Sequence, residues 1–286
     1  MSSLLCLYLV SILYLSLANP FARLWSHSIR QSLYEQEVED VNSLHRIGNH
    51  LARRLIVMPL TDIFKANSVD PMYGKVHYGD KCSLPSSIGK IIFDQRYEVP
   101  WLFEIKPVKR KSKLAPSVAI SNGSPGEDDE IAKPYYRRGK IDSSYISPLD
   151  FRAPENYIFL PKWLMNDLNL QPYDAVDVSF VRIRLADLVV LQPLSLSWDA
   201  LIEEIGDPKS LLEHEVNKYS SLTAGSTIYI EMKGKEYALY VKETRAEGGV
   251  AVKAVRIQDS DVRADIDRTV LDQLIDRQED QKKKVQ

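Results

Sequence analysis

The sequence predicts a mainly β protein with an α+β part: a β-barrel made of two similar halves, followed by a small α+β subdomain. Three observations support this fold class. A Leu-Pro-x-x-Ile/Leu pattern occurs twice, 76 residues apart, and strand-like apolar runs flank both copies. After residue 194 the pattern changes to two amphipathic helices followed by three short strands. Such a change from strands to mixed elements indicates a second structural unit.

The first 18 residues are predicted to be a signal peptide. The stretch from Leu4 to Ala18 is apolar and uncharged, and its length suits the apolar core of a signal peptide better than a membrane span. Small side chains at Ser16 and Ala18 suit the −3 and −1 positions of a cleavage site. We therefore expect cleavage between Ala18 and Asn19, with an uncleaved short anchor as the alternative.

Residues 19–54 are predicted to be a transit peptide or a linker. The part from Asn19 to Tyr34 contains Arg23, Arg30 and several serines but no acidic residue, which is typical of transit peptides. A signal peptide followed by such a stretch resembles the bipartite leader of proteins sent to a plastid acquired by secondary endosymbiosis. The alternative is a flexible linker, because acidic and basic residues alternate in blocks after Tyr34.

The barrel is predicted to span residues 55–195, and its two halves carry the repeated motif. The motif stands at Leu84-Pro85 and again at Leu160-Pro161, and each copy predicts a strand, a short helix and a second strand. A proline just past a strand suits helix position N1, where its missing N–H is not needed. Two such halves favour one barrel on a pseudo-twofold axis, and chance similarity is the alternative.

A long mobile insertion is predicted between the halves, at residues 107–147. Its blocks of like charge and its Gly, Ser and Pro residues cannot bury enough apolar surface to order the segment. The basic blocks favour solvated loop charge over an anion-binding surface. Asn122 opens a glycosylation acceptor pattern, Asn-Gly-Ser, whose use the sequence does not decide.

The second half predicts strands at 157–160, 175–182 and 185–191. Gln192-Pro193 is expected to end that sheet, because proline cannot donate to a β-ladder. Trp163 lies on the short helix beside the second Leu-Pro corner. We expect the indole to be a core residue, with a partner-binding anchor as the alternative.

The α+β subdomain is predicted at residues 196–258. One helical face is expected from Trp198 to Ile205, ended by Gly206, and Asp207-Pro208 supplies the N-cap and N1 pair of a second helix. Three short strands with alternating apolar residues follow. Residues 259–286 are predicted to be an amphipathic helix, from the four-residue spacing of Val262, Ile266, Val270 and Leu274, fading into a polar tail.

Composition and motifs exclude several functions. The charge is nearly balanced, with 37 basic and 39 acidic residues, so the chain offers no nucleic-acid groove. If the leader with Cys6 is removed, Cys82 has no intrachain partner, and we expect it to be a small buried residue. No metal-binding spacing, phosphate loop or nucleophile motif occurs. We therefore predict no catalytic residue, no metal, no cofactor and no small-molecule substrate. The chain is predicted not to be an enzyme.

The sequence resembles the ubiquitin fusion degradation protein family. The resemblance rests on motifs that occur in the family's order and cover roughly residues 55–257, interrupted by the insertion. They are Asp80-Lys81-Cys82-Ser83-Leu84-Pro85, Pro100-Trp101-Leu102-Phe103, Leu160-Pro161-Lys162-Trp163-Leu164, Leu191-Gln192-Pro193, Asp207-Pro208-Lys209 and Leu222-Thr223-Ala224-Gly225. The family residues carried over here are structural, and the resemblance does not place a partner-binding surface.

The resemblance implies a double-psi β-barrel and an adaptor function. Members of the family are not enzymes. They pair with a zinc-finger partner of the nuclear protein localisation family and present ubiquitin-tagged proteins to a valosin-containing-protein-type AAA ATPase in ER-associated degradation. This chain departs from the family by its short C-terminal part, which lacks Phe-x-Gly-x-Gly boxes, and by its leader. The shortened tail leaves recruitment of the zinc-finger partner and the ATPase open.

The leader favours a plastid-associated relative. Duplicated degradation machinery of this kind resides around secondary plastids such as the apicoplast, where it is thought to assist preprotein import. The sequence therefore predicts an adaptor for ubiquitin or a ubiquitin-like protein that enters by a signal peptide and works in the periplastid compartment. The alternatives are an ordinary adaptor at the cytoplasmic or ER membrane surface, and a scaffold for AAA or translocon assembly. The oligomeric state is not predicted.

Overall fold

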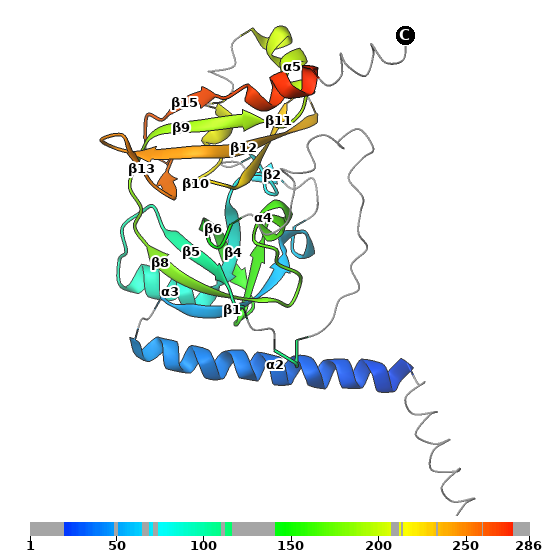
Figure 1. Cartoon of the computed structure of the whole chain (residues 1–286). Coiled ribbons are helices and arrows are strands. Elements are labelled where there is room, and N and C mark those ends of the chain that lie inside the picture. The colour runs from blue at the N-terminus through cyan, green and yellow to red at the C-terminus, as the bar shows by residue number, and fades with distance from the viewer. Residues whose placement is uncertain are drawn as a thin grey trace, which may run out of the picture.

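The structure is a computed structural model, and it describes residues 20–48, 51–64, 69–70, 74–109, 112–115, 141–206, 212, 214–232, 234–258 and 260–276. A barrel lies between a second unit above it and one long helix, α2, below it (Figure 1). Several predicted features fall outside the described residues: the leader with its cleavage site at Ala18 and Asn19, most of the insertion with Asn122, the pair Asp207-Pro208, and the polar tail.

The barrel is closed and contains strands from both halves of the repeat. The first half supplies β1 (Arg53–Pro59), β4 (Lys81–Pro85), helix α3 (Ser86–Asp94) and β5 (Leu102–Pro107). The second half supplies β6 (Ser144–Ala153), β7 (Tyr157–Leu160), helix α4 (Lys162–Asp167) and β8 (Ala175–Val181). The 3-10 turn η1 (Leu60–Asp62) and the small pair β2 (Val69–Asp70) and β3 (Gly74–Lys75) lie between β1 and β4 in sequence.

The strand order is β1-β7-β4-β6-β5-β8, closing back on β1. Pairs β1·β7 and β4·β6 are parallel, and the four other pairs are antiparallel. Every neighbour in the ring therefore comes from the opposite half, and exchanging the halves leaves the order unchanged. The predicted double-psi barrel with a pseudo-twofold axis is confirmed.

The two Leu-Pro corners differ from the prediction in one detail. Pro85 and Pro161 are extended residues that precede their helices, so each proline is an N-cap and not an N1 residue. Leu84 and Leu160, just before them, are fully buried. Helix α3 has nine residues and α4 has six. Because the two helices differ in length, the constant residue spacing between the two halves does not continue past them.

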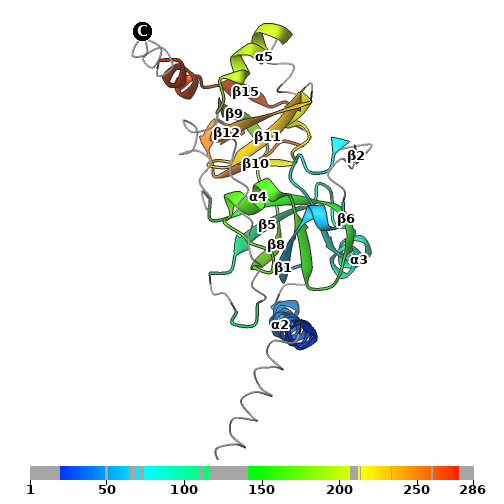
Figure 2. The same ribbon diagram turned by 90° about the vertical axis from the view of Figure 1, so that its right-hand side faces the viewer.

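Helix α2 (Pro20–Gly48) occupies most of the segment predicted to be a transit peptide or linker. It runs along the barrel beside β1, and Figure 2 shows it end-on. Tyr34 and Val38 are buried against Ile56 of β1, together with partly buried Leu114 from the start of the insertion. A helix packed in this way does not fit the flexible-linker alternative for this part of the chain.

The second unit is built on a sheet with the order β11-β12-β9-β15, in which β13 also pairs with β12. Its strands are β9 (Ala186–Pro193), β11 (Thr227–Met232), β12 (Lys235–Ala246), β13 (Val250–Ala251) and β15 (Arg263–Ile266). Strands β10 (Ser221–Thr223) and β14 (Ala254–Arg256) form a separate pair, and helix α5 (Ser197–Ile205) ends at Gly206 with φ +78°. The predicted α+β subdomain is confirmed.

Two predictions about this unit are wrong. Strand β9, assigned to the barrel within 55–195, pairs with β12 and β15, so the barrel ends at Val181 and not at residue 195. The predicted C-terminal helix does not include Val262 or Ile266: residues 263–266 form β15, and the helix covers 269–276. A four-residue spacing is a multiple of two, so it fits one face of a strand as well as one face of a helix.

Candidate functional site

Trp163 lies at the junction of the barrel and the second unit. Its ring contacts both hydrophobic cores, and its Nε1 donates a hydrogen bond to the carbonyl oxygen of Gly79 at 3.0 Å. It meets the ring of Tyr219 edge-to-face, with centroids 5.8 Å apart. Gly79 has φ +90°, and a Cβ there would stand 2.7 Å from the carbonyl oxygen of Lys218. The junction thus requires glycine at this position.

A buried polar network crosses the same junction. The Asp80 carboxylate accepts hydrogen bonds from the backbone N–H groups of Ser220 and Ser221, both at 2.9 Å, and from the Ser221 hydroxyl at 3.2 Å. Lys81 Nζ donates to Ser147 Oγ at 2.7 Å and to Ser220 Oγ at 2.6 Å. Both charged residues are at least 95% buried. Since burying such groups is favourable only when they are satisfied, the network fixes how the two units sit together.

Three other motif residues, Gln192, Pro193 and Cys82, also lie within the scaffold. Gln192 and Pro193 are buried at the end of β9, and Gln192 Nε2 donates to Asp267 Oδ2 at 3.2 Å. Cys82 is buried as expected, and burial raises the pKa of its thiol well above the usual value. The structure does not gather the described motif residues into a single cleft, and Asp207-Pro208 lie outside the part that it describes.

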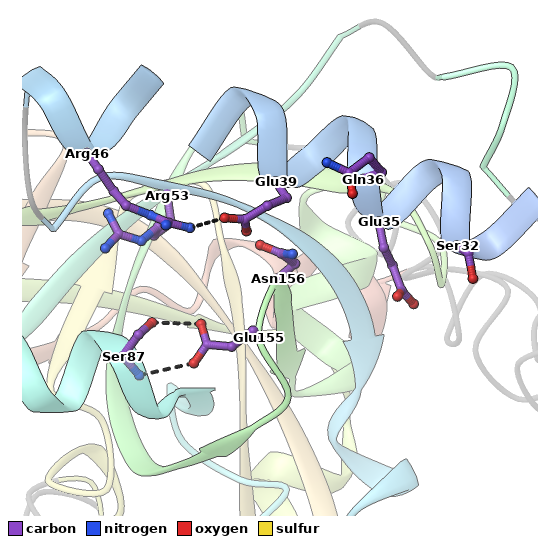
Figure 3. A pocket seen from close by; sticks show the side chains of 9 residues that line it. All are labelled: Ser32, Glu35, Gln36, Glu39, Arg46, Arg53, Ser87, Glu155 and Asn156. Carbon is purple, nitrogen blue, oxygen red and sulfur yellow. Dashed lines mark hydrogen bonds and ion pairs between the residues drawn. The ribbon is translucent and has the colours of Figure 1, made fainter. Parts of the chain in front are cut away.

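A groove of about 640 Å³ lies between α2 and the barrel (Figure 3). Side chains from α2, from the start of α3 and from the turn before β7 face it. It is lined by Ser32, Glu35, Gln36, Glu39, Arg46, Arg53, Ser87, Glu155 and Asn156.

The charged groups of this groove are mostly paired. Glu39 accepts from Arg46, and the Glu155 carboxylate accepts from the backbone N–H and the hydroxyl of Ser87, at the N-terminus of α3. Arg53 is 95% buried and donates to the carbonyl oxygen of Ala52 at 2.7 Å. Its burial and the neighbouring Arg46 lower the pKa of its guanidinium. The groove therefore presents fixed charges of both signs beside a helix N-terminus.

Hydrogen bonds fix α2 above the groove. The Asn42 carboxamide accepts from the backbone N–H of Arg54 at 2.6 Å and donates to its carbonyl oxygen at 2.8 Å. Pairing of β1 with β7 starts only at Ile56. At Arg54 the Asn42 side chain therefore makes the two backbone hydrogen bonds that a neighbouring strand would otherwise make. Tyr34 donates to the Tyr173 carbonyl oxygen at 3.0 Å, and burial raises the pKa of Tyr34 to about 12.

The sequence did not indicate this helix or its groove. In α2, Tyr34 and Val38 are buried but Leu33 and Leu44 are exposed. The apolar residues of this helix therefore do not gather on one face. A signal was nevertheless present in the spacing of Tyr34, Val38 and Asn42, which puts them on one helical face. Across the described residues, no three or more His, Cys, Asp or Glu side chains are grouped to hold a metal ion. Within the same residues, no helix combines the length and apolarity needed to cross a membrane.

Two family models match the chain, one for each structural unit. Residues 60–184 match the model for ubiquitin fusion degradation protein UFD1, N-terminal subdomain 1, and residues 185–269 match the model for subdomain 2. The boundary between the models falls between β8 and β9, where the structure separates the barrel from the second sheet. The models leave out α2.

Curated relatives match over parts of their length. Ubiquitin fusion degradation protein 1 of Saccharomyces cerevisiae is 30% identical over 117 residues, which are 41% of this chain and 31% of the yeast protein. Its Caenorhabditis elegans homolog is 23% identical over 222 residues, 78% of this chain and 54% of the worm protein. Ubiquitin recognition factor in ER-associated degradation protein 1 of Mus musculus is 34% identical over 124 residues, 43% of this chain and 38% of the mouse protein. The aligned stretches thus take up about a third to a half of these relatives.

Proposed function

Because this chain belongs to the ubiquitin fusion degradation protein family, we propose that it is a non-enzymatic adaptor. In this proposal it binds ubiquitin or a ubiquitin-like tag and hands the tagged protein to an AAA unfoldase of the valosin-containing-protein type. The observation that carries the proposal is the match of both N-terminal subdomain models over residues 60–269. The mouse relative is named for ubiquitin recognition in ER-associated degradation, which supports a ubiquitin-like ligand.

The junction between the units supports an adaptor role in physical terms. Asp80 and Lys81 bind residues of the second unit through buried hydrogen bonds, and Trp163 packs between the cores. Two units joined in this way present their outer surfaces at a fixed spacing. A rigid surface of this kind loses little conformational entropy when it binds a folded protein such as ubiquitin.

We further propose that the adaptor serves preprotein import across a membrane of a secondary plastid. The apolar start of the sequence and the basic, acid-free stretch after it support this address. Because Tyr34, Val38 and Asn42 are packed on the barrel, any leader that is removed should end before residue 31. A zinc-finger partner of the nuclear protein localisation family remains part of the proposal.

The address is tested with two reporter fusions. Residues 1–30 and residues 1–54 are each fused to a fluorescent protein in the native organism. We expect both to reach the plastid, because the signal should not depend on the packed part of α2. Diffuse cytosolic fluorescence from both fusions would refute the plastid role and favour an ordinary adaptor in ER-associated degradation.

Tag binding is tested with the purified full chain. We expect retention on immobilised ubiquitin chains or on the plastid's own ubiquitin-like protein, competed by the free tag. Binding to neither would refute the adaptor proposal and favour a scaffold for AAA or translocon assembly. Affinity purification from the native organism, followed by mass spectrometry, then identifies the ATPase and any zinc-finger partner.

A further inference from the structure

A second groove, of about 210 Å³, lies where β5 begins and β8 ends, at the seam between the barrel and the second unit. It is lined by Glu98, Val99, Pro100, Leu102, Val181, Arg182, Ile183 and Arg256. The floor is apolar, since Leu102 is 99% buried and pairs with Val181. At the rim, the Val99 side chain is 70% exposed. The volume is below the ~300–1,000 Å³ of typical small-molecule pockets, so it suits a single large side chain.

Trp101 and Phe151, which pack against the barrel core, form a partly exposed aromatic cluster with Phe93. Phe93 is 59% exposed, and its ring meets those of Trp101 at 5.3 Å and Phe151 at 5.9 Å. Trp101 directly follows Pro100 of the groove. Gly89 makes room for the cluster, because a Cβ there would stand 2.7 Å from Phe151 Cγ. Aromatic side chains of this kind dominate the energy of many protein interfaces.

The other end of the groove is basic. Arg256 Nε is buried and has no hydrogen-bond acceptor among the residues that the structure describes. Arg182 pairs with Glu98 at 3.2 Å, but both side chains are more than two-thirds exposed, so that pair contributes little and can be replaced. Arg184 lies beside them, exposed, and its carbonyl oxygen accepts from the backbone N–H of Arg256 at 2.8 Å. Three arginines against one glutamate favour a carboxylate.

We propose that this seam groove docks an extended acidic peptide of a partner protein, with one large apolar side chain in the groove and a following carboxylate on Arg256. The aromatic cluster of Phe93, Trp101 and Phe151 covers the peptide's flank. The carboxylate pairs with the guanidinium of Arg256, which lines the groove. This proposal does not depend on whether the chain binds a ubiquitin-like tag, because the ligand of the groove is an extended acidic peptide and not a folded tag.

The probe is a fluorescein-labelled peptide, Gly-Ser-Leu-Asp-Glu-Ser-Gly, titrated with the full chain and followed by fluorescence polarisation. We expect a Kd on the order of 100 μM, typical of a small contact area. Replacing its leucine with serine, or its two acids with their amides, should weaken binding at least about tenfold, equal to ~1.4 kcal/mol.

Two variants and one matched control complete the test. Val99→Asp and Arg256→Gln should each weaken binding at least about tenfold, whereas Val250→Asp should not, because that valine is similarly exposed but lies on β13. Circular dichroism checks that all three variants fold. No binding by the unmodified chain at about 1 mM, or equal binding by Val99→Asp, would overturn the proposal.

Discussion

Replacing Asp80 with asparagine tests the junction between the two units. The side chain is 99% buried and accepts three hydrogen bonds from Ser220 and Ser221 of the second unit. Asparagine has the same shape but only one acceptor oxygen, so its amide N–H₂ would face a backbone N–H. The variant therefore loses at least one charge-assisted bond and leaves a buried donor without an acceptor.

The expected loss of stability follows from these contacts. A hydrogen bond to a charged group contributes about 1.5–3 kcal/mol, and a buried unsatisfied donor costs about 1–3 kcal/mol. Lys81, 96% buried beside Asp80, also loses its neighbouring negative charge. We expect Asp80→Asn to lower the free energy of unfolding by about 3 kcal/mol.

Urea titrations followed by tryptophan fluorescence and by circular dichroism measure the change, and coincident curves justify a single free energy. Asp94→Asn is the matched control, because Asp94 is exposed at the end of α3, and its effect should stay within about 0.5 kcal/mol. Hydrogen exchange at Ser220 and Ser221 should also accelerate. A loss below about 1 kcal/mol, with exchange unchanged, would refute a structural role for this network.

Three further changes test other contacts. Asn42→Ala removes both bonds to the Arg54 backbone, so we expect α2 to become sensitive to limited proteolysis and the free energy of unfolding to fall by about 2 kcal/mol. Gly89→Ala places a Cβ 2.7 Å from Phe151 Cγ, and overpacking should cost about 1–3 kcal/mol despite the better helix propensity of alanine, measured by thermal unfolding. A hydrogen bond from Lys242, with two from Thr269, lowers the pKa of Asp267 from 3.8 to about 2. The resulting stability is present above the unfolded pKa and lost as the pH falls through the folded one. Asp267→Asn should therefore cost about 1 kcal/mol at neutral pH, after allowance for half-exposed Lys242, and almost nothing near the folded pKa.

The first of these predictions has a control variant, and the other two have outcomes that would contradict them. Ser43→Ala leaves the barrel contacts of α2 intact, since Ser43 is exposed and, among the described residues, bonds only within the helix. Equal proteolysis of this variant and Asn42→Ala would contradict the role of Asn42. An unchanged melting temperature in Gly89→Ala would show that Phe151 moves without cost. An Asp267→Asn effect that persists in acid would show that packing, and not charge, stabilises that corner.

The sequence was sufficient for the barrel because its signals are local and repeated. Leu84 is the last residue but one of β4 and Leu160 is the last residue of β7, and the prolines after them fix where the helices begin. Gly206 likewise marked the end of α5, where φ +78° favours glycine. At such positions the backbone conformation restricts which residue type can occur, so the residue type alone indicates the conformation.

The remaining features depend on contacts that no local pattern encodes. Strand β9 was recognised as a strand, but alternation does not say which sheet it joins. The carboxamide of Asn42 replaces a strand partner only because β7 begins late relative to β1. Strand β14 places Arg256 at the seam, where its Nε has no acceptor among the residues that the structure describes. Pairing choices of this kind are set by tertiary structure.

The alternation of the two halves around the barrel also governs how the chain acquires its structure. No barrel strand hydrogen-bonds to another strand of its own half, so β1, β4 and β5 have no ladder partner until residues beyond 143 are available. Contacts this distant in sequence make folding slow. A chain that enters a compartment from its N-terminus therefore remains without its barrel until most of the second half has followed. Delayed folding of this kind would keep the chain threadable during the import across a plastid membrane that is proposed above.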